Sequence, residues 1–144
     1  MMQAEMELLE LGKDAVPILA TLFSGEARNE FGVPYRNLGL PLRCAIEVAR
    51  RLESDAKPLE PYLLKELKNG SPIAAMALGS LGTLDSESVE ALALSLDGDV
   101  DVSYEAASAL IRCGECANDA VRKTLSKSLR AANTLSKVKI LLAR

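Results

Sequence analysis

Apolar residues recur at helical spacing along most of the chain, in three segments that share one pattern. Residues 44–63, 75–94 and 107–126 each read as an Ala-rich amphipathic helix, a short break and a second helix. The break residues are Glu53, Gly82 and Gly114. Counted back from each break, one helix face carries Ala45, Ala74 and Ala106 at eight positions, Ala49, Leu78 and Leu110 at four, and Leu52, Leu81 and Cys113 at one. The shared face predicts a column of buried side chains that runs through stacked helix pairs.

An earlier copy of the pattern occupies residues 8–23, with Gly12 at its break. The interval from Gly12 to Glu53 is 41 residues, whereas the later intervals are 29 and 32 residues. The excess is the segment 25–39, which holds three glycines, a proline and two of the five aromatic residues. We therefore expect a single domain over residues 1–144 with an inserted loop at about 25–39. Helices are expected at about 3–11, 14–24, 40–53, 57–69, 72–82, 86–97, 101–113, 117–130 and 134–143.

Composition points to the same fold class. Hydrophobic residues make up 49% of the chain, but aromatic residues only 3%, and Trp is absent. Ala and Leu suit closely packed helices, whereas sandwiches and barrels use bulkier β-branched side chains. Helix pairs of this length cannot bury their apolar stripes alone, so we expect an all-α solenoid in which successive pairs stack.

Three stretches resemble HEAT repeats of the short type, with about 30 residues each, as found in phycobilisome lyase-related proteins. They are KDAVPILATLF, LGTLDSESVEALALSL and DGDVDVSYEAASALIRCGE, and the resemblance covers about residues 8–130. It implies a right-handed α-α superhelix of about four and a half helical-hairpin repeats. Asp99 and Asp101 match the family's turn, but Ser103 stands near the position where the family often has an Arg. The resemblance implies a binding scaffold, since few members are enzymes.

The distribution of charge and the number of cysteines limit the kinds of partner and the cell compartment that the sequence favours. The net charge is −3, but residues 120–144 hold seven of the 17 basic residues and no acid, so residues 1–119 carry −10. A mainly acidic surface argues against a nucleic-acid partner, because such binding depends on neutralising phosphates. No apolar run approaches the length of a membrane span. The acidic N-terminal segment has no export signal, and three cysteines make a poor disulfide framework, so we expect a reduced cytoplasmic protein.

Motifs that could carry chemistry have simpler explanations. Cys113 and Cys116 have the spacing of redox and zinc sites, but the chain adds only Cys44 and no His, so we expect packed or incidental cysteines. Asp97, Asp99 and Asp101 resemble the start of a calcium loop, yet the required Gly and Glu positions hold Val102 and Ser108. Acid–base catalysis lacks its usual histidine. We therefore expect no metal, no cofactor and no enzymatic activity.

The non-core positions of three helices, which we expect on the concave side, are candidates for partner binding. They are Arg43, Glu47, Arg50 and Arg51, then Met76 and Ser80, then Tyr104, Ser108 and Arg112. Tyr104, Ser108 and Arg112 follow a spacing of four residues and share a stripe. In the inserted loop we expect Phe31 to be buried as a cap on the first repeat, and Tyr35, Arg28 and Arg36 to contact a partner.

Together these features favour a non-catalytic protein–protein interaction scaffold that binds a partner on the concave face and the adjacent loop. Two alternatives stay open. One is a small cytoplasmic inhibitor or immunity-type protein, and the other is a lyase or isomerase related to the HEAT-like phycobilisome lyases. A homodimer formed through a terminal repeat is also compatible with the apolar last segment, TLSKVKILLAR.

Overall fold

The computed structural model describes residues 2–114 and 118–142, and most of these residues are helical. The helices are α1 (Met2–Leu11), α2 (Val16–Ser24), α3 (Gly39–Leu52), α4 (Glu60–Lys68), α5 (Pro72–Gly79), α6 (Ser86–Ser95), α7 (Val100–Cys113), α8 (Asn118–Leu125) and α9 (Leu129–Leu142). Short 3-10 turns cover Gly12–Ala15, Tyr35–Asn37 and Glu53–Leu59. The prediction of an all-α chain is confirmed.

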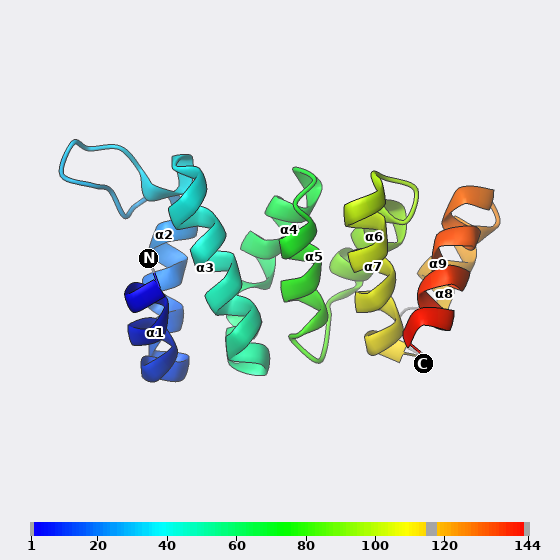
Figure 1. Ribbon diagram of the computed structural model, residues 1–144, viewed down its shortest axis with the longest axis horizontal. Helices are drawn as coiled ribbons and strands as arrows, with labels where there is room; N and C mark the ends of the chain where they lie inside the picture. The colour runs from blue at the N-terminus through cyan, green and yellow to red at the C-terminus, as the bar shows by residue number, and fades with distance from the viewer. Residues whose placement is uncertain (1, 115–117, 143–144) are drawn as a thin grey trace.

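The helices form two layers (Figure 1). α1, α3, α5, α7 and α9 lie side by side in one layer, each against the next, and we call this the odd layer. α2, α4, α6 and α8 form the second layer, again in chain order. Each helix contacts the next helix of its own layer, and the two layers meet where α2 packs on α3, α4 on α5, α6 on α7 and α8 on α9. α1 and α9 lie at opposite ends of the row (Figure 1).

The core fills the space between the layers and follows the predicted column. Eight of the nine predicted column residues are buried, namely Ala45, Ala49, Leu52, Ala74, Leu78, Leu81, Ala106 and Leu110. The ninth, Cys113, is half-buried. The small side chains allow close helix contacts, above all between α5 and α7, where the backbone of Gly79 faces Ala109. Phe23 of α2 and Tyr62 of α4 stack with ring centroids 5.9 Å apart and extend the core along the second layer.

Backbone conformation supports the alignment of the repeats. The four break residues, Gly12, Glu53, Gly82 and Gly114, all have positive φ, at 59°, 53°, 87° and 69°. Glycine reaches this region without steric cost, because it has no Cβ. A residue with positive φ therefore follows the first helix of each pair, even where Glu53 replaces glycine.

Two predicted boundaries near the C-terminus are wrong. The sequence pattern predicts helices at 117–130 and 134–143, whereas the structure ends α8 at Leu125 and begins α9 at Leu129. Ser128 explains the shift, because its Oγ accepts a hydrogen bond from the backbone N–H of Ala131 at 3.1 Å and so caps α9. The same hydroxyl donates to Asp97 Oδ1 at 2.7 Å, which ties this turn to the one before α7.

The inserted segment is an ordered hairpin that projects from one end of the row (Figure 1). Tyr35 N–H donates to the Ala27 carbonyl at 3.0 Å, and Asn29 N–H donates to the Val33 carbonyl at 2.9 Å. The Asn29 side chain accepts from Phe31 N–H and Val33 N–H at the tip. Phe31 itself is 81% exposed, so the prediction that it caps the first repeat is wrong. These hydrogen bonds close the hairpin, and the Phe31 ring lies outside the core.

Candidate binding groove

Three of the candidate side chains lie together in a groove across the odd layer. Arg43 of α3, Met76 of α5 and Tyr104 of α7 line a depression of about 740 Å³. Its apolar floor includes Leu42, Ile46 and Ile73. We call this depression the α3–α7 groove.

The acidic rim of the groove was not among the sequence candidates. Asp101 and Glu105 line it from α7, one helical turn apart on the same face. Neither carboxylate forms an ion pair with any residue that the structure describes. The family resemblance places Asp101 at the turn between repeats, at the start of the helix predicted over 101–113. Its spacing of four from Glu105 was the available signal.

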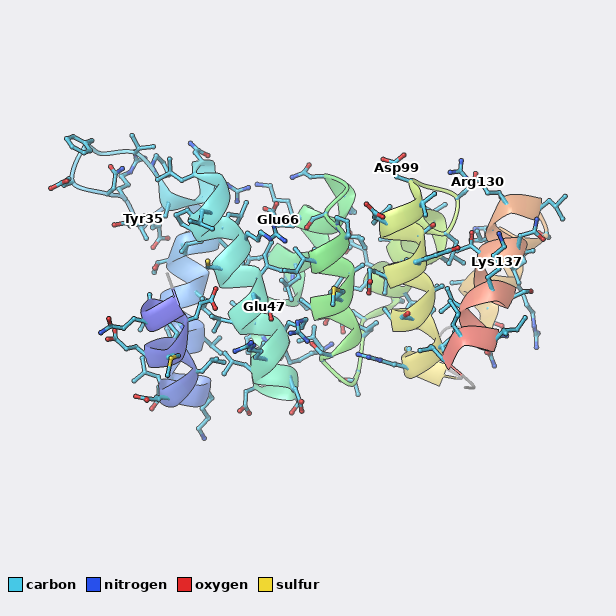
Figure 2. The ribbon with its side chains drawn as sticks, in the orientation of Figure 1. Tyr35, Glu47, Glu66, Asp99, Arg130 and Lys137 are labelled. Atoms are coloured by element: carbon cyan, nitrogen blue, oxygen red, sulfur yellow. The ribbon has the colours of Figure 1, made fainter. Side chains whose placement is uncertain are left out.

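A second depression, of about 380 Å³, lies on the other side of Tyr104, between α7 and α9. Arg130 and Lys137 line it from α9, where they stand two helical turns apart (Figure 2), and Asn133 lies between them. We call it the α7–α9 pocket. Within the described parts of the chain, Arg130 and Lys137 have no carboxylate partner. Tyr104, which is 37% exposed, lines both depressions.

Glu47, Arg50 and Arg51 form a self-contained cluster on α3. Glu47 accepts a hydrogen bond from Arg50 at 2.5 Å and makes an ion pair with Arg51 at 3.3 Å. The hydrogen bond from Arg50 lowers the pKa of Glu47 below its ordinary value, despite some desolvation. None of the three lines the α3–α7 groove. Ser108 and Arg112 likewise lie further along α7 and outside it.

Arg36 ties the hairpin to the body of the protein. Its Nη2 lies 3.0 Å from Oε1 of Glu66, a carboxylate that α4 holds in a nearly buried position. Its Nη1 donates to the carbonyl of Phe23 at the end of α2. Because both contacts are internal, Arg36 holds the base of the hairpin against α2 and α4. Arg28 also bonds within the hairpin, to the Gly32 carbonyl at 2.7 Å, and Tyr35 is half-buried beside it.

A further buried carboxylate links two successive helix pairs. Glu60 at the start of α4 is 3% exposed and accepts a hydrogen bond from the Asp85 backbone N–H at 2.8 Å, and it also pairs with Lys57. Lys57 in turn donates to the Thr83 carbonyl at 3.1 Å. Burial raises the pKa of Glu60, but hydrogen bonds from Lys57, Asp85 and Ser88 outweigh it, so the pKa is lowered. Only the spacing of three between Lys57 and Glu60 hinted at this network in the sequence.

The cysteines and aspartates of the candidate chemical motifs lie in bonds or turns that belong to the fold. Cys113 is disulfide-bonded, which corrects the expectation of a reduced thiol at this position, while residues 115–117 of the CGEC motif lie outside the described residues. Cys44 is buried against α1, and burial raises the pKa of its thiol. Asp97 accepts the hydrogen bond from Ser128, and Asp99 precedes α7. No three His, Cys, Asp or Glu side chains in the described ranges are placed to hold a metal ion.

Comparisons with known proteins returned no match, whether to family models, to curated proteins or to solved structures. Within residues 2–114 and 118–142, no helix combines the length and apolar character needed to cross a bilayer.

Proposed function

We propose that this chain is a right-handed, HEAT-like superhelix of about four and a half helix pairs that acts as a non-catalytic binding module. Its ligand is an extended segment of another protein, which lies across α3, α5, α7 and α9. The segment runs along the row of helices and places apolar side chains on the groove floor.

One observation carries the proposal: the α3–α7 groove combines an apolar floor with charged groups that the fold does not use. Leu42, Ile46 and Ile73 supply the floor, while Asp101 and Glu105 stand on the rim without internal partners. Charges that stabilise a fold are normally paired, as Glu47 and Glu60 are here. Unpaired charges beside an apolar floor are the usual composition of a binding surface, whose core is apolar and whose rim is polar.

Rigid helices favour binding by this groove. Its walls come from α3, α5 and α7, whose inner faces are buried in the core, so the lining side chains start from a fixed backbone. A preformed surface loses less conformational entropy on binding than a loop that must order. Groups with shifted pKa values, namely Cys44, Glu47, Arg50, Lys57 and Glu60, stand outside the groove lining. This arrangement supports binding over catalysis, because catalytic groups with shifted pKa values cluster in the site they serve.

Selection of ligands from a displayed library of random peptides tests the proposal. Peptides selected on the wild-type protein should lose binding to the groove variants Met76→Arg and Tyr104→Ala, with folding checked by circular dichroism. Leu94→Ala is the matched control, because Leu94 is 72% exposed on α6, in the other layer. Selected peptides that bind both groove variants as well as they bind the wild type would refute the proposal.

A further inference from the structure

We propose that Tyr104 separates two subsites of opposite charge, so that the bound segment carries a cationic side chain and an anionic side chain about three residues apart. The inference rests on the proposed function and names the chemistry of the ligand.

The cation subsite is the α7 wall of the α3–α7 groove. Asp101 and Glu105 point from one face of α7 toward the same depression and have no internal counter-ion among the described residues. The nearest cation in the lining is Arg43, which stands across the groove on α3, with Ile73 and Met76 of α5 between. A Lys or Arg side chain of the ligand would therefore meet two carboxylates that form no ion pair within the described residues, with Arg43 on the opposite wall.

The anion subsite is the α7–α9 pocket. Arg130 and Lys137 face it from α9, and the exposed Asn133 adds an amide between them. A planar guanidinium binds a carboxylate through two parallel hydrogen bonds, and a lysine adds a point charge beside it. The exposed side chains of Val100 and Leu129 border the pocket and offer contact to the carbon chain of a Glu or Asp residue.

The spacing between the subsites follows from helix packing. The groove and the pocket lie on opposite sides of α7, and packed helices are separated by about 8–10 Å. An extended chain advances about 3.3 Å per residue, so a segment crossing α7 needs about three residues to bring opposite charges to the two subsites. Tyr104 lies under those residues, where its ring can contact the side chain between the charges.

Charge reversal on the two sides of Tyr104 provides the test. Random eight-residue peptides are selected on the wild-type protein, on Asp101→Lys/Glu105→Lys and on Arg130→Glu/Lys137→Glu. Wild-type binders should carry Lys or Arg about three positions from Asp or Glu. Peptides selected on the first variant should carry an acidic residue where the wild-type binders carry the basic one. Peptides selected on the second variant should carry a basic residue where the wild-type binders carry the acidic one. If the half-buried Glu105 does not tolerate charge reversal, the single variant Asp101→Lys replaces the double variant in this selection.

A synthetic wild-type ligand then supplies the quantitative measurement. Reversing its acidic residue should weaken binding to the wild-type protein about fivefold or more, and binding should recover with Arg130→Glu/Lys137→Glu. Ligands that are blocked by Met76→Arg but show no charge preference, or no reversal, would overturn this inference and leave the proposed function intact. Ligands that bind Met76→Arg as tightly as they bind the wild type would instead overturn the proposed function.

Discussion

Glu53 occupies a backbone conformation that favours glycine. It is the one residue other than glycine in the described chain with positive φ, and its ψ of −127° is close to the −130° of Gly114 at the equivalent break. A side chain in this region costs about 1–3 kcal/mol. We expect Glu53→Gly to raise the free energy of unfolding by about 1 kcal/mol, once the larger chain entropy of glycine is subtracted. Urea denaturation measures the change.

Glu53→Ala is the control for this prediction, because it removes the carboxylate but retains the Cβ. It should give no comparable gain. If both variants shift the urea midpoint equally, the charge of Glu53 and not its backbone conformation is responsible.

Glu60 provides a prediction about pH. Burial raises its pKa, yet hydrogen bonds from Lys57, Asp85 and Ser88 bring the net pKa below the ordinary value of 4.5. A lowered folded-state pKa means that the carboxylate stabilises the fold above about pH 4.5 and that this contribution is lost as the pH falls through the folded pKa. Glu60→Gln should therefore cost about 2 kcal/mol at pH 7 and progressively less in acid.

Thermal unfolding of the wild type and Glu60→Gln between pH 3 and pH 7 checks this expectation. Glu87→Gln is the matched control, since Glu87 pairs with Lys68 on the exposed surface and should matter little at any pH. If the difference in melting temperature between the wild type and Glu60→Gln stays constant as the pH falls, the ionised carboxylate is not the stabilising form.

At the scale of elements, α5 and α7 approach closely because Gly79 has no side chain. A Cβ at Gly79 would lie 3.0 Å from both Cα and Cβ of Ala109. Ala is favoured over Gly in helices by about 1 kcal/mol, but overpacking against a neighbouring backbone costs about 1–3 kcal/mol. We expect Gly79→Ala to lower the melting temperature. Gly39→Ala, where a Cβ meets nothing within 4 Å, should leave it unchanged or raise it.

Helix positions were predictable from the sequence wherever the apolar period was strong. The column from Ala45 to Leu110 depends on local spacing alone, and its members are buried as expected. The break before α9 was misplaced because Ser128 caps that helix while bonded to Asp97, a partner 31 positions away. The hydrogen bond between Arg36 and Glu66 spans 30 positions, and apolar periodicity does not predict it either, because periodicity describes only local spacing.

The binding surface was predictable only in part, for a related reason. Arg43, Met76 and Tyr104 follow from the exposed stripes of three helices, and the structure brings them to one groove. Arg130 and Lys137 were recognisable only as members of the basic run in residues 120–144, because the misplaced boundary assigned them to two different helices. Which charges remain unpaired is a property of the folded chain, since it depends on side chains that meet across helices.

At the scale of the whole molecule, burial is distributed unevenly along the row of helices. α7 buries six of its side chains, whereas α8 buries none. Since each helix contacts only its near neighbours, local opening can involve one part of the row without the rest. We expect native-state hydrogen exchange to give α8 a lower opening free energy than α5 and α7.

Ser128→Ala tests whether that local stability depends on the tie between successive turns. The substitution removes the cap of α9 and the hydrogen bond to Asp97, and we expect it to lower the opening free energy of α8 and α9 by about 1 kcal/mol. Ser126→Ala is the matched control, because that hydroxyl bonds only to the nearby Lys123 carbonyl. Amides of α3 and α5 should exchange as in the wild type. If their exchange accelerates together with that of α8, the molecule opens as one cooperative unit and the expected local behaviour is wrong.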